Sequence, residues 1–526
     1  MKKSLLLILV LFCTKTVCQK KENDLEVKII SNVKWWAGVL IEGHKMPLKD
    51  GYEAQLYGTS YFNQLQPLLL SNSGELVWSE EPFRFRVNKE KILFDESYAP
   101  LEYKKAGKNL REAYLYASEN FFPPSGKMPP ELFFSVPQYN TWIELTYNQN
   151  QKDILEYARA IIDTGMPPGI LMIDDNWQED YGKWNFHQGR FPNPKAMMKE
   201  LKELGFKVML WVCPFVSADS DVYRNLEKKR VFMLDETEKP AMVRWWNGVS
   251  AVLDLTNPES EIWFKGVLNN LMNEFGVDGF KLDAGDGRFY KGINSLKKVN
   301  PNTHTELFAK IGLSYPYNEY RATWKMGGQP LVQRLHDKSH DWEDLKKLIP
   351  HMLLEGIMGY PFSCPDMIGG GQFTSFLDDA PIDQELVVRS TQVHALMPMM
   401  QFSVAPWRIL DKRHFNAVLS AVNLRSKFKE IILTLAKKSS INGEPIVRSM
   451  EYVFPHEGYV DITDQFMLGN NILVTPYLSK GEGSRDVILP KGKWKSDTGK
   501  LYVGGKKITI RVPLTRLPYF VNINSN

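Results

Sequence analysis

Residues 277–286 read Val-Asp-Gly-Phe-Lys-Leu-Asp-Ala-Gly-Asp, a short apolar strand that runs directly into the carboxylates Asp283 and Asp286. Lys281 lies two residues before Asp283, so the two side chains share one face of the strand. A carboxylate at the C-terminal end of a buried strand, beside a cation, is how barrel enzymes present a nucleophile. The other interpretation is that Asp283 caps the next helix. The stretch therefore predicts a parallel strand and a candidate nucleophile at Asp283.

Short apolar strands alternate with amphipathic helices through residues 131–440. We predict strands at 132–136, 170–173, 207–212, 277–282, 319–323, 333–336, 359–362 and 399–402. We predict helices at 152–163, 194–204, 259–275, 342–354 and 384–396, and a closing helix at 415–437. This alternation is typical of βα units on a parallel sheet. Eight strands, most of them followed by polar residues, favour an α/β fold of the (β/α)8 TIM barrel type over a doubly wound sheet.

Two β-rich regions flank the predicted barrel. Residues 19–130 begin with short alternating segments such as 83–87, which predict an N-terminal β-sandwich. Residues 441–526 return to strand patterns, with clean alternation over 506–513. We therefore expect an N-terminal β-sandwich, a catalytic barrel over 131–440 and a C-terminal β-domain.

Residues 1–18 have the pattern of a signal peptide. Lys2 and Lys3 precede an apolar run over 4–13 that is too short to span a bilayer. We expect cleavage near Cys18, export to the periplasm or the cell exterior, and no stable membrane insertion. A lipid anchor at Cys18 is the alternative, and it is disfavoured because the residues before Cys18 are not small.

Composition excludes several classes of function. The chain has 65 Lys and Arg against 61 Asp and Glu, spread along its length, whereas nucleic-acid binding needs concentrated basic surface. Cys213 and Cys364 are predicted to be small buried residues rather than a disulfide framework. The sequence contains no Cys/His cluster with metal spacing, no phosphate loop and no dinucleotide fingerprint, so no metal or cofactor is expected.

Polar and aromatic residues recur where the predicted strands end, which in barrels is the face of the active site. They are Asp174, Asp175 and Trp177 after the second strand, Trp211 in the third, Asp283 after the fourth, Arg321 in the fifth, Asp337 after the sixth and Asp366 after the seventh. Any one of these Asp or Arg residues could form a structural ion pair instead. Their recurrence after successive strands favours a common site.

Two carboxylates, cations and no metal predict glycoside hydrolysis, which needs one ionised carboxylate and one protonated acid across the scissile bond. Asp283 suits the first role because Lys281 would lower its pKa. Asp337 suits the second, although Lys338 would oppose this if it pointed inward. A double-displacement glycosidase requires the two carboxyl groups to lie roughly 5–6 Å apart across one pocket.

These motifs resemble glycoside hydrolase family 31, the retaining α-glycosidases. The resemblance rests on Lys281-Leu-Asp-Ala-Gly-Asp, on Arg321-Ala-Thr-Trp, and on Asp337 followed five positions later by Trp342. Residues 361–370, 470–476 and 489–494 also resemble family segments. The resemblance covers most of the mature chain.

The resemblance implies a role for each matched residue. Asp283 would be the nucleophile and Asp337 the acid/base, with Asp174, or its rival Asp175, and Arg321 holding sugar hydroxyls. Asp286 and Asp366 fall on acidic positions of the motifs, and Lys281 would keep Asp283 ionised. Trp177, Trp211, Trp245 and Trp246 are candidates for sugar stacking, and core packing is the other interpretation of each.

The sequence also departs from the α-glucosidases of the family. His336 and Lys338 flank Asp337, and Gln401-Phe-Ser stands where a His is found after strand eight. The Lys-Leu-Asp-Ala-Gly-Asp form resembles the branch that contains α-galactosidases, so a terminal α-galactoside is the expected substrate. The alternatives are an α-glucosidase or α-xylosidase, a transglycosylase, and a carbohydrate-binding protein on an inactive scaffold.

Overall fold

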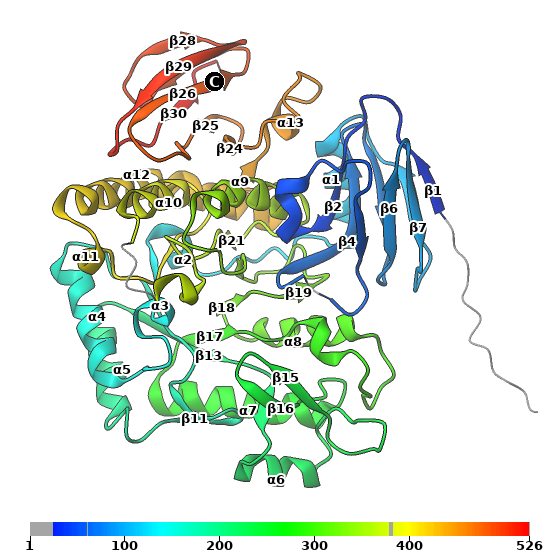
Figure 1. Cartoon of the computed structure of the whole chain (residues 1–526), viewed down its shortest axis with the longest axis vertical. Coiled ribbons are helices and arrows are strands. Elements are labelled where there is room, and N and C mark those ends of the chain that lie inside the picture. Colours follow the sequence, from blue (N-terminus) through cyan, green and yellow to red (C-terminus); the bar gives the residue numbers. More distant parts are fainter. Residues whose placement is uncertain (1–24, 60, 378–381, 525–526) are drawn as a thin grey trace, which may run out of the picture.

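The computed structural model describes residues 25–59, 61–377 and 382–524. It shows a central barrel with a β-sandwich at its side and a second β-domain above it (Figure 1). The predicted signal peptide and Cys18 lie outside the described residues. None of the described helices combines the length and apolar character that a membrane crossing requires.

The N-terminal region is the β-sandwich that the sequence predicts. One antiparallel sheet has the order β1 (Leu25–Lys28), β7 (Lys91–Asp95), β6 (Arg84–Asn88) and β3 (Glu53–Gln55). The second contains β2 (Trp35–Val39), β4 (Gln64–Ser71), β5 (Glu75–Trp78) and β8 (Glu102–Lys105). All of β4 is buried, so this strand joins the sandwich core to the barrel. Helix α1 (Leu110–Phe121) then leads into the barrel.

Eight parallel strands follow one another around the barrel in chain order. They are β9 (Gln138–Asn140), β10 (Ile170–Ile173), β13 (Lys207–Val212), β17 (Gly279–Leu282), β18 (Tyr317–Tyr320), β20 (Gln333–Arg334), β21 (Ser363–Cys364) and β22 (Gln401–Phe402). A parallel bridge between Met367 and Gln401 closes the ring between its last two strands. The predicted fold class is therefore confirmed.

The helices around the barrel begin at residues that cap them. They are α4 (Gln151–Asp163), α5 (Pro194–Glu203), α7 (Pro258–Phe275), α8 (Pro301–Gly312), α9 (Trp342–Ile357), α10 (Gln384–Ala395) and α12 (Lys412–Asn442). In each, a preceding Asn or Asp side chain accepts a hydrogen bond from a first-turn N–H. Pro follows that cap in α5, α7 and α8, where its missing N–H removes no helix bond.

Three strand predictions were wrong in detail. Residues 132–136, predicted as the first strand, instead form helix α2 (Leu132–Ser135), and β9 is the first strand. Periodicity cannot distinguish so short an apolar run in a helix from one in a strand. Residues 319–323 divide, because β18 ends at Tyr320 and β19 (Thr323–Trp324) pairs with β4 of the sandwich. The seventh strand lies at β21, just beyond the predicted 359–362.

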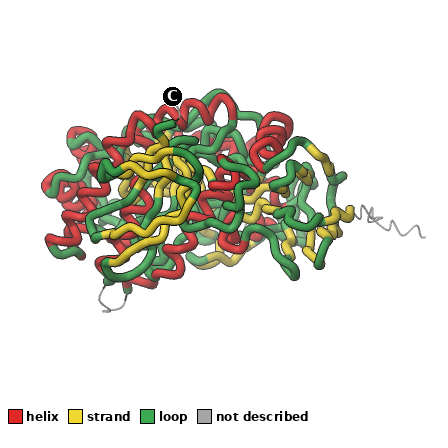
Figure 2. The backbone as a smooth tube through the Cα atoms, turned by 90° about the horizontal axis from the view of Figure 1, so that it is seen from above, coloured by secondary structure: helices red, strands yellow, loops and turns green. Residues whose placement is uncertain are grey.

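The C-terminal β-domain also agrees with the predicted fold class. One sheet has the order β23 (Val447–Arg448), β24 (Phe466–Leu468), β25 (Ile472–Val474), β30 (Tyr519–Asn522), β27 (Lys493–Ser496) and β28 (Leu501–Val503). A separate antiparallel pair of β26 (Gly483–Leu489) and β29 (Lys506–Val512) packs against it around Trp494. Seen from above, helices surround much of the molecule and the N-terminal strands lie at one end (Figure 2).

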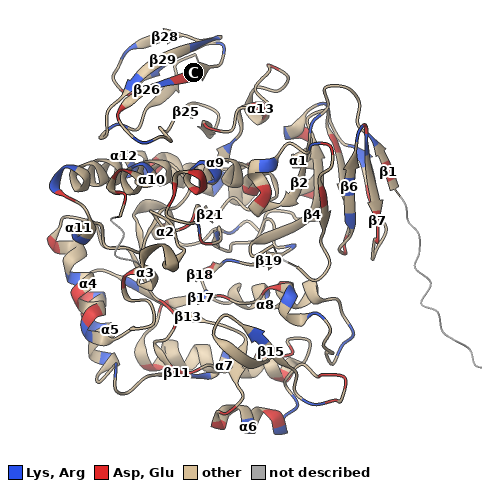
Figure 3. Ribbon diagram, viewed as in Figure 1, with Lys and Arg blue, Asp and Glu red and all other residues tan. Residues whose placement is uncertain are grey.

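Two insertions after barrel strands extend toward the open end of the barrel. The hairpin β11 (Gln178–Asp180) and β12 (Lys183–Phe186) follows β10. A three-stranded sheet of β14 (Phe215–Ser217), β16 (Gly248–Val252) and β15 (Met242–Trp245) follows β13. Cys213 and Cys364 are buried and unbonded, as predicted. Charges of both signs are interspersed over the visible ribbon (Figure 3).

Candidate active site

A cavity of about 600 Å³ opens at the C-terminal ends of the barrel strands. Eight of the predicted site residues line it: Asp174, Asp175, Trp211, Trp246, Lys281, Asp283, Arg321 and Asp337. They come from strands two to six and from the insertion after β13. The barrel therefore brings both candidate catalytic carboxylates, Asp283 and Asp337, to one cavity, and the 5–6 Å separation of their carboxyl groups stays a prediction.

Asp283 is held by donors on both of its carboxylate oxygens. Oδ1 accepts hydrogen bonds from Arg321 Nε at 3.0 Å and from the backbone N–H of Ala284 at 2.8 Å. Oδ2 accepts one from Trp211 Nε1 at 3.1 Å. Burial alone would raise the pKa of Asp283, but Arg321 and then Lys281 outweigh burial and hold it well below its usual value. Asp283 is therefore an ionised carboxylate.

The backbone after Asp283 adopts a conformation that is uncommon for a residue with a side chain. Ala284 has a φ of +61°, in the left-handed region. This turn directs the N–H of Ala284 back onto the Asp283 carboxylate. Strained residues of this kind concentrate at functional sites.

Asp286 orients Arg321 from behind rather than lining the cavity. Its carboxylate pairs with the Arg321 guanidinium at 3.2 Å (Nη1–Oδ1) and 2.7 Å (Nη2–Oδ2), and it is fully buried. Arg321 Nη1 also donates to the carbonyl of Phe62, in the N-terminal sandwich, at 2.7 Å. Asp286 therefore acts through Arg321 and does not line the cavity where a substrate would bind.

Lys281 pairs with Asp174 rather than with Asp283. Lys281 Nζ lies 2.6 Å from Asp174 Oδ2, and both side chains are buried. Burial alone would lower the pKa of Lys281, but Asp174 outweighs it and the pKa is raised. The ion pair forms the floor of the cavity, and Lys281 acts on Asp283 more weakly than Arg321 does.

Asp175, the rival of Asp174, lines the same cavity with different partners. Its carboxylate accepts hydrogen bonds from Asn247 Nδ2 at 2.5 Å and from Tyr181 OH at 3.2 Å. Burial and the neighbouring charge of Asp174 raise the pKa of Asp175 to about 7. The two adjacent carboxyl groups therefore have different environments. Asp174 is paired with the cation of Lys281, whereas the raised pKa of Asp175 favours its protonated form up to near-neutral pH.

Asp337 is held by Arg334, a residue that the sequence interpretation missed. Arg334 Nη1 lies 2.8 Å from Asp337 Oδ1 and 2.8 Å from Asp366 Oδ1, and its Nε lies 3.4 Å from Glu319 Oε1. Arg334 is buried, whereas the Asp337 side chain is 33% exposed. One arginine therefore anchors Asp337 to two buried carboxyl groups, while Asp337 itself stays open to the cavity.

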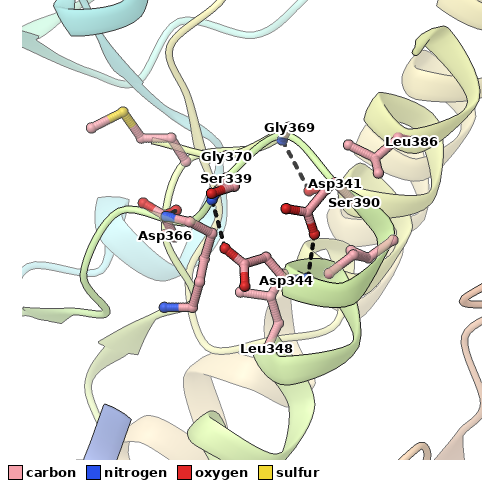
Figure 4. A pocket seen from close by; sticks show the side chains of 12 residues that line it. Ser339, Asp341, Asp344, Leu348, Asp366, Gly369, Gly370, Leu386 and Ser390 are labelled. Atoms are coloured by element: carbon pink, nitrogen blue, oxygen red, sulfur yellow. Dashed lines mark hydrogen bonds between the residues drawn. The ribbon is translucent and has the colours of Figure 1, made fainter. Parts of the chain in front are cut away.

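Asp366 is buried beside the segment that follows β20 and bears Asp337, and it does not line the large cavity. It borders a separate cavity of about 10 Å³ with Lys338, Ser339 and Gly370 (Figure 4). Its Oδ2 accepts hydrogen bonds from the N–H groups of Lys338 at 2.7 Å and Gly371 at 3.0 Å. Burial raises the pKa of Asp366 to about 7 although Arg334 acts against it. Asp366 therefore organises the segment that bears Asp337.

The two neighbours of Asp337 in the sequence line different cavities. Lys338 Nζ donates to the carbonyl of His336 at 2.8 Å, and Lys338 lines the small cavity rather than the large one. Burial lowers the pKa of Lys338 to about 8 and that of His336 to about 2. His336 lines the large cavity as a neutral imidazole. Lys338 therefore does not line the cavity that Asp337 lines.

The four candidate tryptophans divide into two pairs. Trp211 and Trp246 line the cavity. Trp177 is fully buried against Trp184 and Phe186 and donates to the carbonyl of Trp211 at 2.8 Å. Trp245 packs beneath Trp211 and donates to Ser250 Oγ at 3.1 Å. Sugar stacking was wrong for Trp177 and Trp245, because other aromatic rings cover both.

Several lining residues were not predicted as site residues. They are Phe62, Trp142, Tyr147, Arg288, Arg334, His336, Gln372 and Phe373. Arg334 had a sequence signal, since it stands in the predicted sixth strand three residues before Asp337. Phe62 had none, because it reaches the barrel from the sandwich.

The eighth strand ends below the cavity. Gln401 Nε2 donates to Glu319 Oε2 at 2.7 Å and to Gln138 Oε1 at 3.1 Å inside the barrel. Among the described lining residues, none comes from β22. Within residues 25–59, 61–377 and 382–524, no group of three His, Cys, Asp or Glu is placed to hold a metal ion.

Known proteins are similar to this chain over most of its length. The mouse myogenesis-regulating glycosidase is 33% identical over 412 residues, covering 75% of this chain and 57% of that protein. Alpha-glucosidase 2 of Bacillus thermoamyloliquefaciens is 25% identical, covering 72% of this chain and 51% of that protein. The chain thus spans little more than half the length of these relatives.

A solved structure shares the fold over nearly the whole chain. A GH31 alpha-xylosidase from a soil metagenome, complexed with xylose, superposes with a TM-score of 0.83 at 20% identity, covering 96% of this chain and 80% of that chain. The model of the glycosyl hydrolases family 31 TIM-barrel domain matches residues 126–435, and that of the family's C-terminal domain matches residues 443–525. The chain belongs to glycosyl hydrolase family 31.

Proposed function

We propose that this chain is a retaining exo-α-glycosidase that removes a terminal α-linked sugar in two displacement steps. The observation that carries the proposal is an ionised Asp283 in a cavity that Asp337 also lines. Relatives named as glycosidase and alpha-glucosidase support the reaction class. An inactive carbohydrate-binding scaffold is less consistent with two carboxylates and Arg321 held in this arrangement.

In the first step Asp283 attacks the anomeric carbon. Its Oδ2, which accepts a hydrogen bond only from Trp211 among the described residues, is the freer oxygen. A C–O bond forms to Asp283 as the bond to the aglycone oxygen breaks, and Asp337 delivers a proton to that oxygen. Arg321, held by Asp286, keeps Asp283 ionised and oriented until attack.

In the second step Asp337, now ionised, takes a proton from water. The water oxygen bonds to the anomeric carbon and the ester to Asp283 breaks, which restores the α configuration and both carboxyl groups. The exposed position of Asp337 gives water access, whereas the Lys281–Asp174 pair closes the floor. A closed floor accommodates a chain end, so the proposal is an exo-acting enzyme.

We place a terminal α-glucoside or α-xyloside first among the substrates. The 25% identical relative is named alpha-glucosidase 2, and a relative from Emericella nidulans, also 25% identical, is named alpha-xylosidase. An α-galactoside, expected from the nucleophile motif, is the second candidate.

A panel of 4-nitrophenyl α-glycosides of glucose, xylose and galactose tests the proposal. We expect release of nitrophenol from at least one member, with the sugar appearing first as the α anomer by NMR. Preference for glucose or xylose supports the first candidate, and preference for galactose the second. Binding of the panel without turnover of any member would reject the enzymatic proposal in favour of a binding protein, and a first-formed β anomer would reject the retaining mechanism.

Gly371 lies against the carboxyl groups of Asp337 and Asp366, so a substitution there tests whether the position of Asp337 matters for catalysis. A Cβ at Gly371 would lie 2.7 Å from Asp366 Oδ1 and 2.8 Å from Asp337 Oδ1, closer than non-bonded atoms approach. We expect Gly371→Ala to displace Asp337 and lower kcat by about tenfold to a hundredfold, since misplacement of about 1 Å has effects of that size. Steady-state kinetics on the best panel substrate measures this.

Gly266→Ala is the matched control. Gly266 lies on α7, and its added Cβ would meet nothing within 4 Å. We expect unchanged kcat and a slightly raised melting temperature, because Ala is the better helix former. If kcat is unchanged in Gly371→Ala as well, the backbone around Gly371 adjusts without moving Asp337, and the expectation is wrong.

A further inference from the structure

We propose that Arg288 forms an oxyanion site on the aglycone side of the cavity, so that the preferred substrate bears a carboxylate, sulfate or phosphate on the group that leaves. The inference rests on the proposed glycosidase function and adds the chemical class of the aglycone. Four cations line the cavity, and they differ in whether a carboxylate already pairs with them.

Three of these cations are already paired. Lys281 pairs with Asp174, Arg321 with Asp286 and Asp283, and Arg334 with Asp366 and Asp337. Arg288 makes no ion pair and donates no hydrogen bond to any of the described residues. Of the four lining cations, Arg288 is therefore the one whose charge and donors are available to a ligand.

The guanidinium of Arg288 is nevertheless held in place. It lies 4.2 Å from the ring centroid of Phe62 and 4.6 Å from that of Phe289. Contacts with aromatic faces restrain the plane of an arginine while leaving its N–H edges free to bind. The backbone of Phe62 is itself held, because its carbonyl accepts the hydrogen bond from Arg321. Arg288 is therefore oriented before any ligand arrives.

Arg288 lies at the rim of the cavity, where the aglycone extends. The floor residues Asp174 and Lys281 are 2% and 4% exposed, whereas Phe62 and Trp246 at the rim are 47% and 44% exposed. Arg288 is exposed as well. In an exo-acting enzyme the terminal sugar occupies the closed floor, so the leaving group meets Phe62, Trp246 and Arg288. Trp246 also packs against the buried ring of Phe289, which supports it at the rim.

An oxyanion suits this site better than a neutral hydroxyl. The fork of N–H groups on Arg matches two oxygens of a carboxylate, sulfate or phosphate, and charge-assisted hydrogen bonds are about twice as strong as neutral ones. The nearby carboxylates Asp283 and Asp286 are already paired with Arg321, which reduces their repulsion of an incoming anion. An anionic aglycone would therefore pair with Arg288, the lining cation that has no ion-pair partner among the described residues.

Paired ligands that differ only in charge test this inference. They are 4-carboxyphenyl and 4-carbamoylphenyl α-thioglycosides of glucose, xylose and galactose, whose sulfur linkage resists hydrolysis, with Kd measured by calorimetry. For the sugar that binds best, we expect the full chain to bind the carboxylate about tenfold more tightly, as a charge-assisted contact supplies. We expect the preference to fall as salt is raised and to disappear in Arg288→Gln.

Arg224→Gln is the matched control, because it removes one positive charge from the exposed face of helix α6 (Asp221–Lys228), away from the cavity. We expect it to retain the preference. Equal affinity for the two ligands, or a preference that survives in Arg288→Gln, would overturn the inference. This test measures binding and the nitrophenyl panel measures turnover, so the two proposals can fail separately. If the panel shows no turnover, the proposed function is rejected, and the Kd values still decide whether Arg288 binds an oxyanion.

Discussion

Replacing Asp283 by Asn is expected to lower kcat by about four orders of magnitude or more, the scale seen when a covalent nucleophile is removed. The amide has nearly the same shape, and its one oxygen can accept the hydrogen bonds from Arg321 Nε and the Ala284 N–H, so we expect the fold to persist although Trp211 Nε1 loses its acceptor. It carries no charge and cannot form the ester. Steady-state kinetics on the best nitrophenyl glycoside, with circular dichroism for the fold, measures both parts of the expectation.

The electrostatics of Asp283 add an expectation for the unmodified chain. Burial would raise its pKa, but Arg321 and Lys281 outweigh burial and the net shift is downward. Asp283 therefore stays ionised well below neutral pH. The acidic limb of the kcat/KM profile should arise from a group other than Asp283.

Asp278→Asn is the matched control for Asp283→Asn. Asp278 stands just before β17, at the opposite end from Asp283, and pairs with Lys207 outside the cavity. We expect it to retain kcat. In Asp283→Ala, where space is left beside the sugar, azide should restore turnover and give the β-glycosyl azide by a single inversion. Near-normal hydrolysis by Asp283→Asn would reject its assignment as nucleophile.

Sequence reasoning succeeded where local chemistry and barrel geometry agree. Asp283 follows a buried strand that is apolar except for Lys281, and a parallel barrel places the ends of its strands around one opening. The same argument predicts from the sequence that Asp174, Arg321 and Asp337 lie at one site, and all three line the cavity. The Asn and Asp caps that begin the helices are equally local signals.

What sequence reasoning missed depends on contacts between distant segments. Phe62 reaches the cavity because β4 pairs with β19, and neither sequence shows that pairing. Trp177 and Trp245 look like sugar platforms until their neighbours are known. Lys281 shares a face with Asp283, yet it binds Asp174 across the barrel, 107 residues away in sequence. Arg334 stands in the predicted sixth strand, but its contact with Asp366, 32 residues away in sequence, has no local signal.

Replacing Asp337 by Ala is expected to separate substrates by their leaving groups. General acid catalysis supplies about 10²–10⁴-fold where the departing oxygen is basic. We expect a loss of that size on alkyl or disaccharide glycosides, and a much smaller loss in the first step on 2,4-dinitrophenyl glycosides, which depart without a proton. Removing the partly exposed carboxylate leaves Arg334 paired with Asp366 and Glu319, so the fold should persist.

The second step supplies an independent check, because water needs a base and azide does not. In Asp337→Ala the glycosyl-enzyme should accumulate on dinitrophenyl glycosides, giving a burst, and azide should then release the α-glycosyl azide. Glu343→Ala removes an exposed carboxylate six residues further on, which pairs with Lys346, and should behave as the unmodified chain does. Equal losses on good and poor leaving groups, with no azide product, would mean that Asp337 neither donates nor accepts the proton; Arg334 would then be holding it for a purely structural reason.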